Sequence, residues 1–293
     1  MVRRVGRAGY EDDHANASGV PNHFLESQTT DIAYIHVVVP ARNEAEAIAD
    51  CLVAVGIASS AIPDSVTVTV TLVADRCTDS TVSRAVGSWS GKGSLRIIEA
   101  NAGSAGRARD IGFTSADAEA DPNLERTWVA TTDADSQVPS DWLESHLAYA
   151  NSGFDGVAGT IDILDWEALP DCAARSYRRM LAEARTADGQ HGDVFGANLG
   201  IRASALHAVG GFPDVGHGED HAVWSALRRY GFRLVAPAAL VVRTSGRFAG
   251  RAHGGLADLL GRLALAQEPS DISRDVVNLV RPPLAVVPSQ AAG

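Results

Sequence analysis

The feature that most constrains the fold is an alternation of short β-branched runs with segments of helical periodicity. Each run ends in a polar loop, and apolar residues at helical spacing follow, such as Ile48, Leu52 and Val55 after the first run. Four such units with short connections predict an α/β fold, a mostly parallel sheet with helices on both faces. The predicted strands are residues 34–40, 65–74, 95–99 and 127–132.

The loops between these elements carry helix-start signals and two arginines. We expect Asn43 to cap the first helix, with Glu46 completing a capping-box-like pair, and Thr78 or Asp79 to cap the second. Residues 101–110 are rich in small side chains that permit close approach of a ligand or backbone. Two arginines in this segment indicate an anion, although a Gly-rich turn with solvated arginines has the same pattern.

The second half of the chain is less regular. Segments 154–163, 195–201, 232–235 and 239–242 are expected as strands, and 167–187, 203–209, 221–230 and 250–267 as helices. The divisions we expect are a flexible arm at 1–30, one domain at 31–250 with halves at 31–150 and 151–250, and a C-terminal helix and extended tail at 251–293.

Composition limits the classes of partner. The net charge is −11, from 25 basic and 36 acidic residues among 293, which argues against binding a nucleic acid polymer. A few local arginines can still hold a nucleotide diphosphate. Three scattered cysteines fit a reduced compartment, no secretory signal is recognised, and no run approaches 18 apolar residues, so we expect a cytoplasmic protein without a transmembrane segment.

Two carboxylates end the fourth predicted strand. Asp133 and Asp135 follow the run Trp128–Thr132 at spacing i, i+2. Parallel strands deliver their C-terminal ends to the ligand crevice of an α/β fold. Hard oxygen ligands in that place suit Mg²⁺ or Mn²⁺ together with substrate phosphates, although an isolated Asp-x-Asp is more often a solvated turn.

Five motifs follow one another in the chain. They are residues 39–44 (Val-Pro-Ala-Arg-Asn-Glu), 73–81 (Val-Ala-Asp-Arg-Cys-Thr-Asp-Ser-Thr), 106–112 (Gly-Arg-Ala-Arg-Asp-Ile-Gly), 133–135 (Asp-Ala-Asp), and 210–212 (Gly-Gly-Phe) followed by Glu219-Asp220. Taken together in this order, they resemble the GT-A glycosyltransferases, whose fold is Rossmann-like, and most closely the large inverting family numbered two. The resemblance covers about residues 34–245, and the ending Thr244-Ser245-Gly246-Arg247 resembles a bacterial subgroup.

The resemblance implies a sugar transfer from a nucleotide-diphospho-sugar, with a UDP- or GDP-sugar as donor, to a hydroxyl acceptor. It implies that Asp135 binds Mg²⁺ or Mn²⁺, that Asp133 faces the ribose or the metal, and that Asp220 is the general base. Substrate contacts are implied at Pro40, Ala41, Arg42 and Glu44 around the nucleoside, Asp75 on the base, Arg107 and Arg109 near the diphosphate, Glu219 beside the base, and Arg243 or Arg247 on the diphosphate.

Some positions depart from the family pattern. Ala74 stands where a first acid is common, and Asp110 places a negative charge close to the expected diphosphate. No histidine follows the last strand until His253, so a third metal ligand is not evident. His217 and His221 flank Asp220 and are candidates for holding acceptor or metal, although a lone histidine is more often an ordinary hydrogen-bonded residue.

Other interpretations remain open from the sequence. Glu219 or Asp220 near a predicted helix start is also what a helix cap requires. A sugar nucleotidyltransferase reuses a similar sheet and Asp pair, but residues 40–44 lack its Gly-rich activating loop. A catalytically inactive GT-A-like module that binds a nucleotide is a further alternative, and retaining enzymes of this fold share the Asp-x-Asp. The acceptor and the oligomeric state are not specified by any motif.

Overall fold

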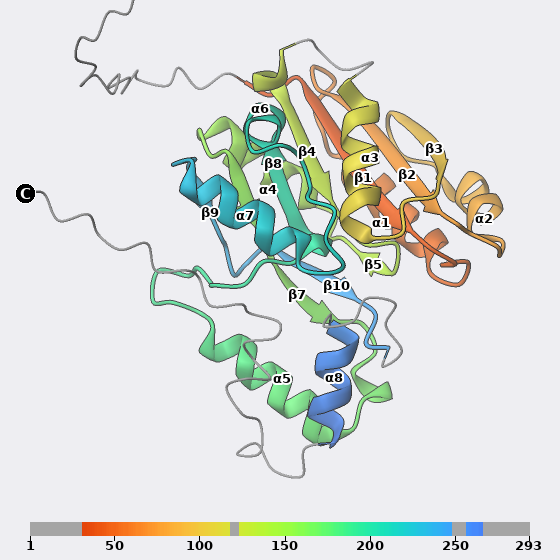
Figure 1. Ribbon diagram of the computed structural model, residues 1–293, viewed down its shortest axis with the longest axis vertical. Helices are drawn as coiled ribbons and strands as arrows, with labels where there is room; N and C mark the ends of the chain where they lie inside the picture. The colour runs from red at the N-terminus through yellow and green to blue at the C-terminus, as the bar shows by residue number, and fades with distance from the viewer. Residues whose placement is uncertain (1–30, 118–122, 248–255, 266–293) are drawn as a thin grey trace, which may run out of the picture.

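The computed structural model describes residues 31–117, 123–247 and 256–265. Its centre is a seven-stranded sheet in the order β3-β2-β1-β4-β8-β6-β9 (Figure 1). Strands β1 to β4 are parallel, whereas β8 runs antiparallel to β4 and β6. The predicted mostly parallel sheet with a mixed second half is thereby confirmed. The strands are β1 (Tyr34–Ala41), β2 (Thr67–Asp75), β3 (Ser94–Ala100), β4 (Thr127–Thr131), β6 (Gly156–Ala158), β8 (Leu199–Arg202) and β9 (Leu234–Val235).

Helices cover both faces of this sheet because its central strands are apolar on both sides. In β1, Val37 and Val39 belong to one hydrophobic cluster, and Val38 belongs to another on the opposite face. A strand buried in this way appears in the sequence as a continuous apolar run. The first face packs against α1 (Ile48–Ser60), α2 (Thr81–Ser88) and α4 (Trp142–Asn151), and the second against α3 (Ala105–Asp117), α6 (Ala203–Ala208) and α7 (Glu219–Arg229).

A smaller layer lies beyond the C-terminal ends of the parallel strands. A three-stranded sheet in the order β5-β10-β7 leads from the main sheet toward two helices that lie side by side (Figure 1). Tyr177, Leu260 and Leu263 form a hydrophobic cluster between these helices. The elements are β5 (Ser136–Gln137), β7 (Thr160–Ile163), β10 (Val241–Thr244), α5 (Asp171–Glu183) and α8 (Leu256–Leu265), with 3₁₀ turns at Leu124–Arg126, Trp166–Ala168 and Gly196–Asn198.

The predicted cap at Asn43 is wrong. Helix α1 begins at Ile48 with Ala47 in the N-cap position, and the Asn43 backbone is left-handed with φ of 53°. The Asn43 Oδ1 atom instead accepts a hydrogen bond from the backbone N–H of Thr78, at 2.7 Å. Asn43 therefore ties the loop after β1 to the loop after β2, a long-range contact that competes successfully with local capping.

The other departures from the predicted elements are small. Residues 196–198, expected in a strand, form a 3₁₀ turn before β8, and the helix expected at 167–187 begins after Pro170. Ser80, rather than Thr78 or Asp79, occupies the N-cap position of α2, while Asp79 accepts a hydrogen bond from the N–H of Thr81 at 3.0 Å. The arm at 1–30 and the tail from 268 lie outside the described residues.

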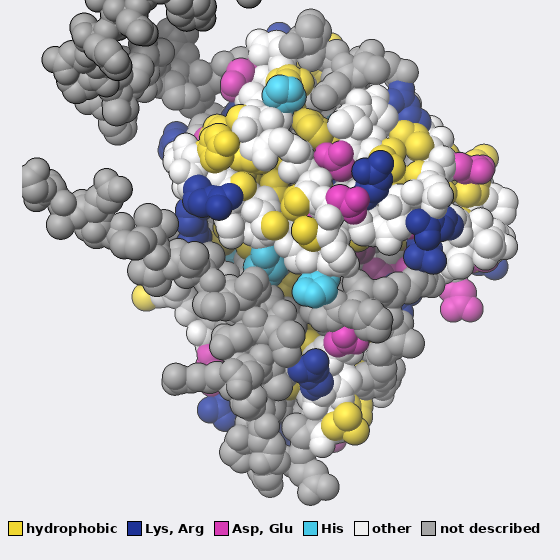
Figure 2. Space-filling model, viewed as in Figure 1, with side chains coloured by type: hydrophobic (Ala, Val, Ile, Leu, Met, Phe, Trp, Pro, Cys, Tyr) yellow, Lys and Arg dark blue, Asp and Glu magenta, His cyan; other side chains and the backbone are white. Residues whose placement is uncertain are grey.

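The surface is mixed in charge on the face seen in Figure 2. Lys and Arg side chains there are interspersed with Asp and Glu rather than gathered in one patch. Within the described part of the chain, no helix is both long and apolar enough to cross a membrane.

Candidate active site

A cavity of about 520 Å³ opens at the C-terminal ends of β1, β2 and β4. This is where ligands bind in open α/β sheets. One wall comes from the ends of these strands and the loops after them, and it includes Pro40, Ala41 and Asp75. The opposite wall comes from α5, α8 and the start of α7. Most of the predicted site residues line it: Pro40, Ala41, Arg42, Glu44, Asp75, Arg109, Asp133, Asp135, Glu219, Asp220 and Arg247.

The Asp133 and Asp135 carboxylates both face this cavity where β4 ends. Asp133 keeps 39% of its side-chain surface exposed, and Asp135 keeps 13%. Burial raises the pKa of Asp135 to about 6, with the neighbouring negative charge of Asp133 adding to the rise and the Arg247 guanidinium opposing it. Both groups therefore favour a positively charged partner, because each carboxylate is partly desolvated beside another.

Arg109 supplies that partner for Asp133. Its side chain is almost completely buried, and its Nη2 donates to Asp133 Oδ1 at 2.5 Å while its Nη1 donates to Glu219 Oε1. The guanidinium lies against Gly196, where an added Cβ would stand 2.6 Å from Nη2. Arg109 thus forms a bridge that joins the end of β4 to the start of α7, and it lines the cavity as well.

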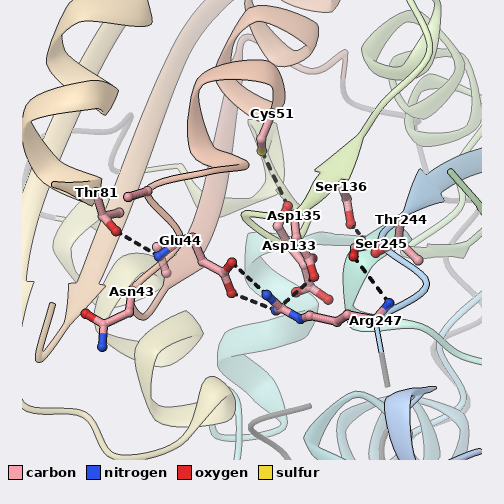
Figure 3. A network of polar contacts seen from close by, with 12 residues as sticks. Asn43, Glu44, Cys51, Thr81, Asp133, Asp135, Ser136, Thr244, Ser245 and Arg247 are labelled. Atoms are coloured by element: carbon pink, nitrogen blue, oxygen red, sulfur yellow. Dashed lines mark hydrogen bonds and ion pairs between the residues drawn. The ribbon is translucent and has the colours of Figure 1, made fainter. Parts of the chain in front are cut away.

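Arg247 supplies the partner for Asp135. Its two terminal nitrogens donate to both oxygens of Glu44, at 2.9 and 2.7 Å, and Nη2 also lies 2.9 Å from Asp135 Oδ2 (Figure 3). Hydrogen bonding to Glu44 is the main cause that raises the pKa of Arg247 above its ordinary value. Arg247 and Glu44, which are 203 positions apart in the chain, are therefore joined beside the Asp133–Asp135 loop.

The side of the cavity lined by Asp75 is held by hydrogen bonds between its carboxylate and backbone N–H groups. Asp75 is 95% buried, and its Oδ1 accepts from the N–H of Ala102 at 2.7 Å while Oδ2 accepts from the N–H of Gly103 at 3.1 Å. The carboxylate thus fixes the loop before α3 as well as facing the cavity. Arg42 lines the same side and is exposed.

Asp220 lies in the first turn of α7, and its carboxylate is oriented by the turn before β8. Its Oδ2 accepts a hydrogen bond from the N–H of Gly196 at 2.8 Å, and Oδ1 accepts from the N–H of His221. Gly218 occupies the N-cap position without a side-chain hydrogen bond, so neither Glu219 nor Asp220 caps the helix. Glu219 is engaged with Arg109, and the cavity lining also includes the carboxylates of Asp220 and Asp193. His217 and His221 also line it.

Two predicted arginines lie away from the cavity. Arg107 is half exposed, with Nη1 4.0 Å from Asp214, and Arg243 is exposed on β10 with a 3.4 Å contact to the carbonyl of Leu164. Residues two apart on a helix point to nearly opposite sides, so Arg109 enters the cavity while Arg107 does not, and Arg247 enters it from the loop beyond the end of β10. Asp110 also turns away, accepting a hydrogen bond from the N–H of Phe212 at 3.1 Å.

The sequence predictions missed the apolar wall of the cavity. It includes Tyr177 and Met180 from α5 and Leu256 from α8. The i, i+3 spacing of the first two within a predicted helix was the available signal, but it indicates only a buried face and not what that face lines.

The residues present fit a divalent cation that is shared with a ligand. Among residues 31–117, 123–247 and 256–265, no three His, Cys, Asp or Glu side chains form a complete metal-binding group. The donor set is the Asp133 and Asp135 carboxylates, and such a two-oxygen set suits Mg²⁺ or Mn²⁺ when phosphate oxygens and water complete the shell.

A family model described as glycosyl transferase family 2 matches residues 36–210. No curated protein matches the chain in sequence. The match covers the first four strands, the Asp133–Asp135 loop and the turn before β8.

Solved structures of the same fold were found as well. The mannosyltransferase PcManGT from Pyrobaculum calidifontis, in complex with GDP-Man and Mn²⁺, has a TM-score of 0.53 and 20% identity over 81% of this chain and 63% of its own. TarS from S. aureus has a TM-score of 0.50 and 17% identity over 72% of this chain, which spans 36% of TarS. The 1–349 fragment of TarS in complex with UDP has a TM-score of 0.50 and 15% identity, with 84% and 69% coverage. At these identities the likeness establishes the fold.

Proposed function

Because the chain belongs to glycosyl transferase family 2, we propose that it transfers a sugar from a nucleoside-diphosphate sugar to a hydroxyl group of an acceptor, with inversion at the anomeric carbon. The observation that carries this proposal is the convergence of Asp133, Asp135 and Asp220 on one cavity at the C-terminal ends of the parallel strands. The proposed domain is residues 31–250, with the nucleotide at residues 31–150 and the acceptor at 151–250, and α8 beyond it contributes to the wall of the cavity.

The donor is a UDP- or GDP-sugar, the classes named with the TarS fragment and with PcManGT. Pro40 and Ala41 provide an apolar surface for the base, and Asp75 offers it a carboxylate already fixed by two backbone N–H groups. Arg42 lies on the same wall and is free of a described ion pair, which suits it to a phosphate or ribose oxygen.

The diphosphate is placed next to Asp133 and Asp135. Mg²⁺ or Mn²⁺ held there would offset the negative charge that gathers on the leaving diphosphate. Arg247 contributes to the same task when it leaves Glu44 and Asp135 and turns its guanidinium to the phosphates. Arg109 fixes the position of Asp133 relative to the start of α7, so that the metal-binding carboxylates and Asp220 keep a constant separation.

Asp220 is the general base. In an inverting transfer, the acceptor hydroxyl attacks the anomeric carbon from the face opposite the diphosphate, and a carboxylate on that face takes its proton. The N–H of Gly196 fixes one Asp220 oxygen. Carboxylate oxygens carry further lone pairs, so the same side chain can also accept from the acceptor hydroxyl.

Calorimetric titration of UDP, GDP and dTDP, each with and without Mn²⁺, tests this proposal on wild type and on Asp135→Asn. We expect one nucleotide to bind tightly in wild type with Mn²⁺, and binding to weaken when either the metal or the carboxylate is removed. Binding that ignores both would contradict a metal site at Asp135, and binding of none of the three would contradict the donor class.

Two further assays separate the alternative functions. Slow, Mn²⁺-dependent hydrolysis of the donor without acceptor distinguishes an enzyme from an inactive binding module. Formation of a nucleotide sugar from a sugar 1-phosphate and a nucleoside triphosphate would instead identify a nucleotidyltransferase.

A further inference from the structure

The cavity has two chemically different ends. The end at the strand loops is polar and carries Arg42, Arg109 and Arg247. The other part is lined by residues of α5 and α8, two helices that lie side by side (Figure 1). This part is largely apolar and includes Ile161, Tyr177, Met180, Phe195, Leu256 and Leu259, and the same cavity is also lined by Asp193, His217 and His221.

Among the described residues, no arginine of α5 or α8 lines the cavity. On α5, the guanidinium of Arg178 stacks 4.1 Å above the Trp166 ring, and Arg179 pairs with Glu183 at 2.7 Å on the exposed side. Of the described cations in the cavity, Arg109 and Arg247 are paired with carboxylates near the Asp-x-Asp loop. As far as the described residues go, a phosphate or carboxylate packed against α5 and α8 would therefore have no arginine partner from these two helices, which makes its desolvation unfavourable.

The apolar end is continuous with the proposed base. Gly196, whose N–H holds Asp220, is next to Phe195 in the chain, and both residues line the cavity. A hydroxyl group presented to Asp220 from the side away from the diphosphate thus has the rest of its molecule among these apolar side chains. The cavity volume of about 520 Å³ covers the strand-loop part and the α5/α8 part together, and it is within the range of small-molecule sites.

We propose that the acceptor carries its hydroxyl beside an uncharged apolar group, such as an aromatic ring or a short alkyl chain, that packs against α5 and α8. This inference rests on the proposed function, because it uses Asp220 as the point where the reacting hydroxyl lies. Burial of apolar surface supplies the affinity, and the hydroxyl at Asp220 supplies the orientation.

Saturation-transfer NMR with matched probes tests the acceptor class. Phenyl β-glucoside, methyl β-glucoside and glucose 6-phosphate are titrated into the full-length protein, with and without Mn²⁺ and the nucleotide that binds. We expect the phenyl glycoside to bind about tenfold or more tightly than the methyl glycoside, and the phosphate to bind weakest. Equal binding of the two glycosides, or tightest binding of the phosphate, would overturn the inference.

Two variants on one helix provide the control. Met180→Gln places a polar group on the cavity wall and should weaken phenyl glycoside binding about fivefold while leaving nucleotide affinity unchanged. Ala182→Gln, at an exposed position of α5 outside the cavity, should change neither. A Met180→Gln protein that melts at lower temperature but keeps wild-type selectivity would mean that the apolar wall is only a packed core. The glycosides are also titrated without nucleotide, so their binding is measured independently of the donor. Failure of the nucleotide to bind would therefore refute the proposed function without deciding the test of the acceptor class.

Discussion

Replacing Arg247 with alanine should affect the metal and the nucleotide in opposite directions. In the structure, Arg247 holds Glu44 through two hydrogen bonds and lies 2.9 Å from Asp135. A divalent cation that binds Asp135 must displace this guanidinium or bind beside it. Its removal should therefore tighten the binding of Mn²⁺ alone, whereas nucleotide binding with saturating Mn²⁺ should weaken because the diphosphate loses a cation.

The magnitudes follow from the charges and their exposure. Two unit charges about 4 Å apart interact by ~1 kcal/mol in water and ~4 kcal/mol near a protein surface. The Arg247 side chain is 36% exposed, so we take a screened value of about 1.5 kcal/mol, which corresponds to roughly tenfold tighter Mn²⁺ binding. Loss of a charge-assisted hydrogen bond to the diphosphate is worth about 1.5–3 kcal/mol, which is roughly 10- to 100-fold in nucleotide affinity.

Calorimetry of Mn²⁺ alone, and of nucleotide in the presence of Mn²⁺, measures both effects. Arg243→Ala is the matched control, because Arg243 lies on the same chain segment but is exposed and outside the cavity, and it should change neither affinity. The reasoning is refuted if Arg247→Ala binds Mn²⁺ no more tightly than wild type, or if both affinities fall together.

Three further predictions concern catalysis, the packing of α3 against the start of α7, and stability at acidic pH. Asp220→Asn should lower the rate of sugar transfer at least about 100-fold and leave nucleotide affinity within about twofold of wild type, because it removes the proton acceptor and keeps the shape of the side chain. A parallel loss of nucleotide affinity in the titration would contradict a role in proton transfer alone. Gly106→Ala should cost about 1–3 kcal/mol in urea unfolding and slow transfer, because its Cβ would lie 2.6 Å from the carbonyl oxygen of Pro213 and 2.8 Å from Glu219 Cβ; an unchanged midpoint and rate would argue against this contact. Burial lowers the pKa of His146 from 6.5 to about 3, so the unfolded state takes up the proton first and stability falls as pH drops below 6.5. Between pH 7 and pH 5 this histidine should lower the free energy of unfolding by about 2 kcal/mol, and in His146→Gln the fall over this pH range should be smaller by that amount. A fall as steep in the variant as in wild type would refute the role of His146.

The framework of the site was predictable because it depends on local patterns. The runs that became β1 and β4 are β-branched and apolar, and strands buried on both faces require that composition. Their parallel arrangement places whatever follows them at one edge of the sheet, so Asp133 and Asp135 could be assigned to the crevice from the sequence.

The partners of the charged residues were not predictable in the same way. Arg109 reaches Glu219 across 110 positions, and Arg247 reaches Glu44 across 203, and no spacing rule connects such pairs. The Asn43 cap failed for the same reason, since a hydrogen bond from the loop after β2 outweighed a local signal. The apolar wall also depends on how α5 meets α8, which helical periodicity does not specify.

The most direct measurement is time-resolved NMR of an α-linked UDP- or GDP-sugar incubated with the protein and Mn²⁺, read at the anomeric proton of the first-formed product. An inverting transferase with Asp220 opposite the diphosphate should release nucleotide and form the β anomer first, and Asp220→Asn should do so at least about 100-fold more slowly. A first-formed α anomer would contradict inversion, and a donor that stays intact with and without acceptors would contradict the proposed transferase activity.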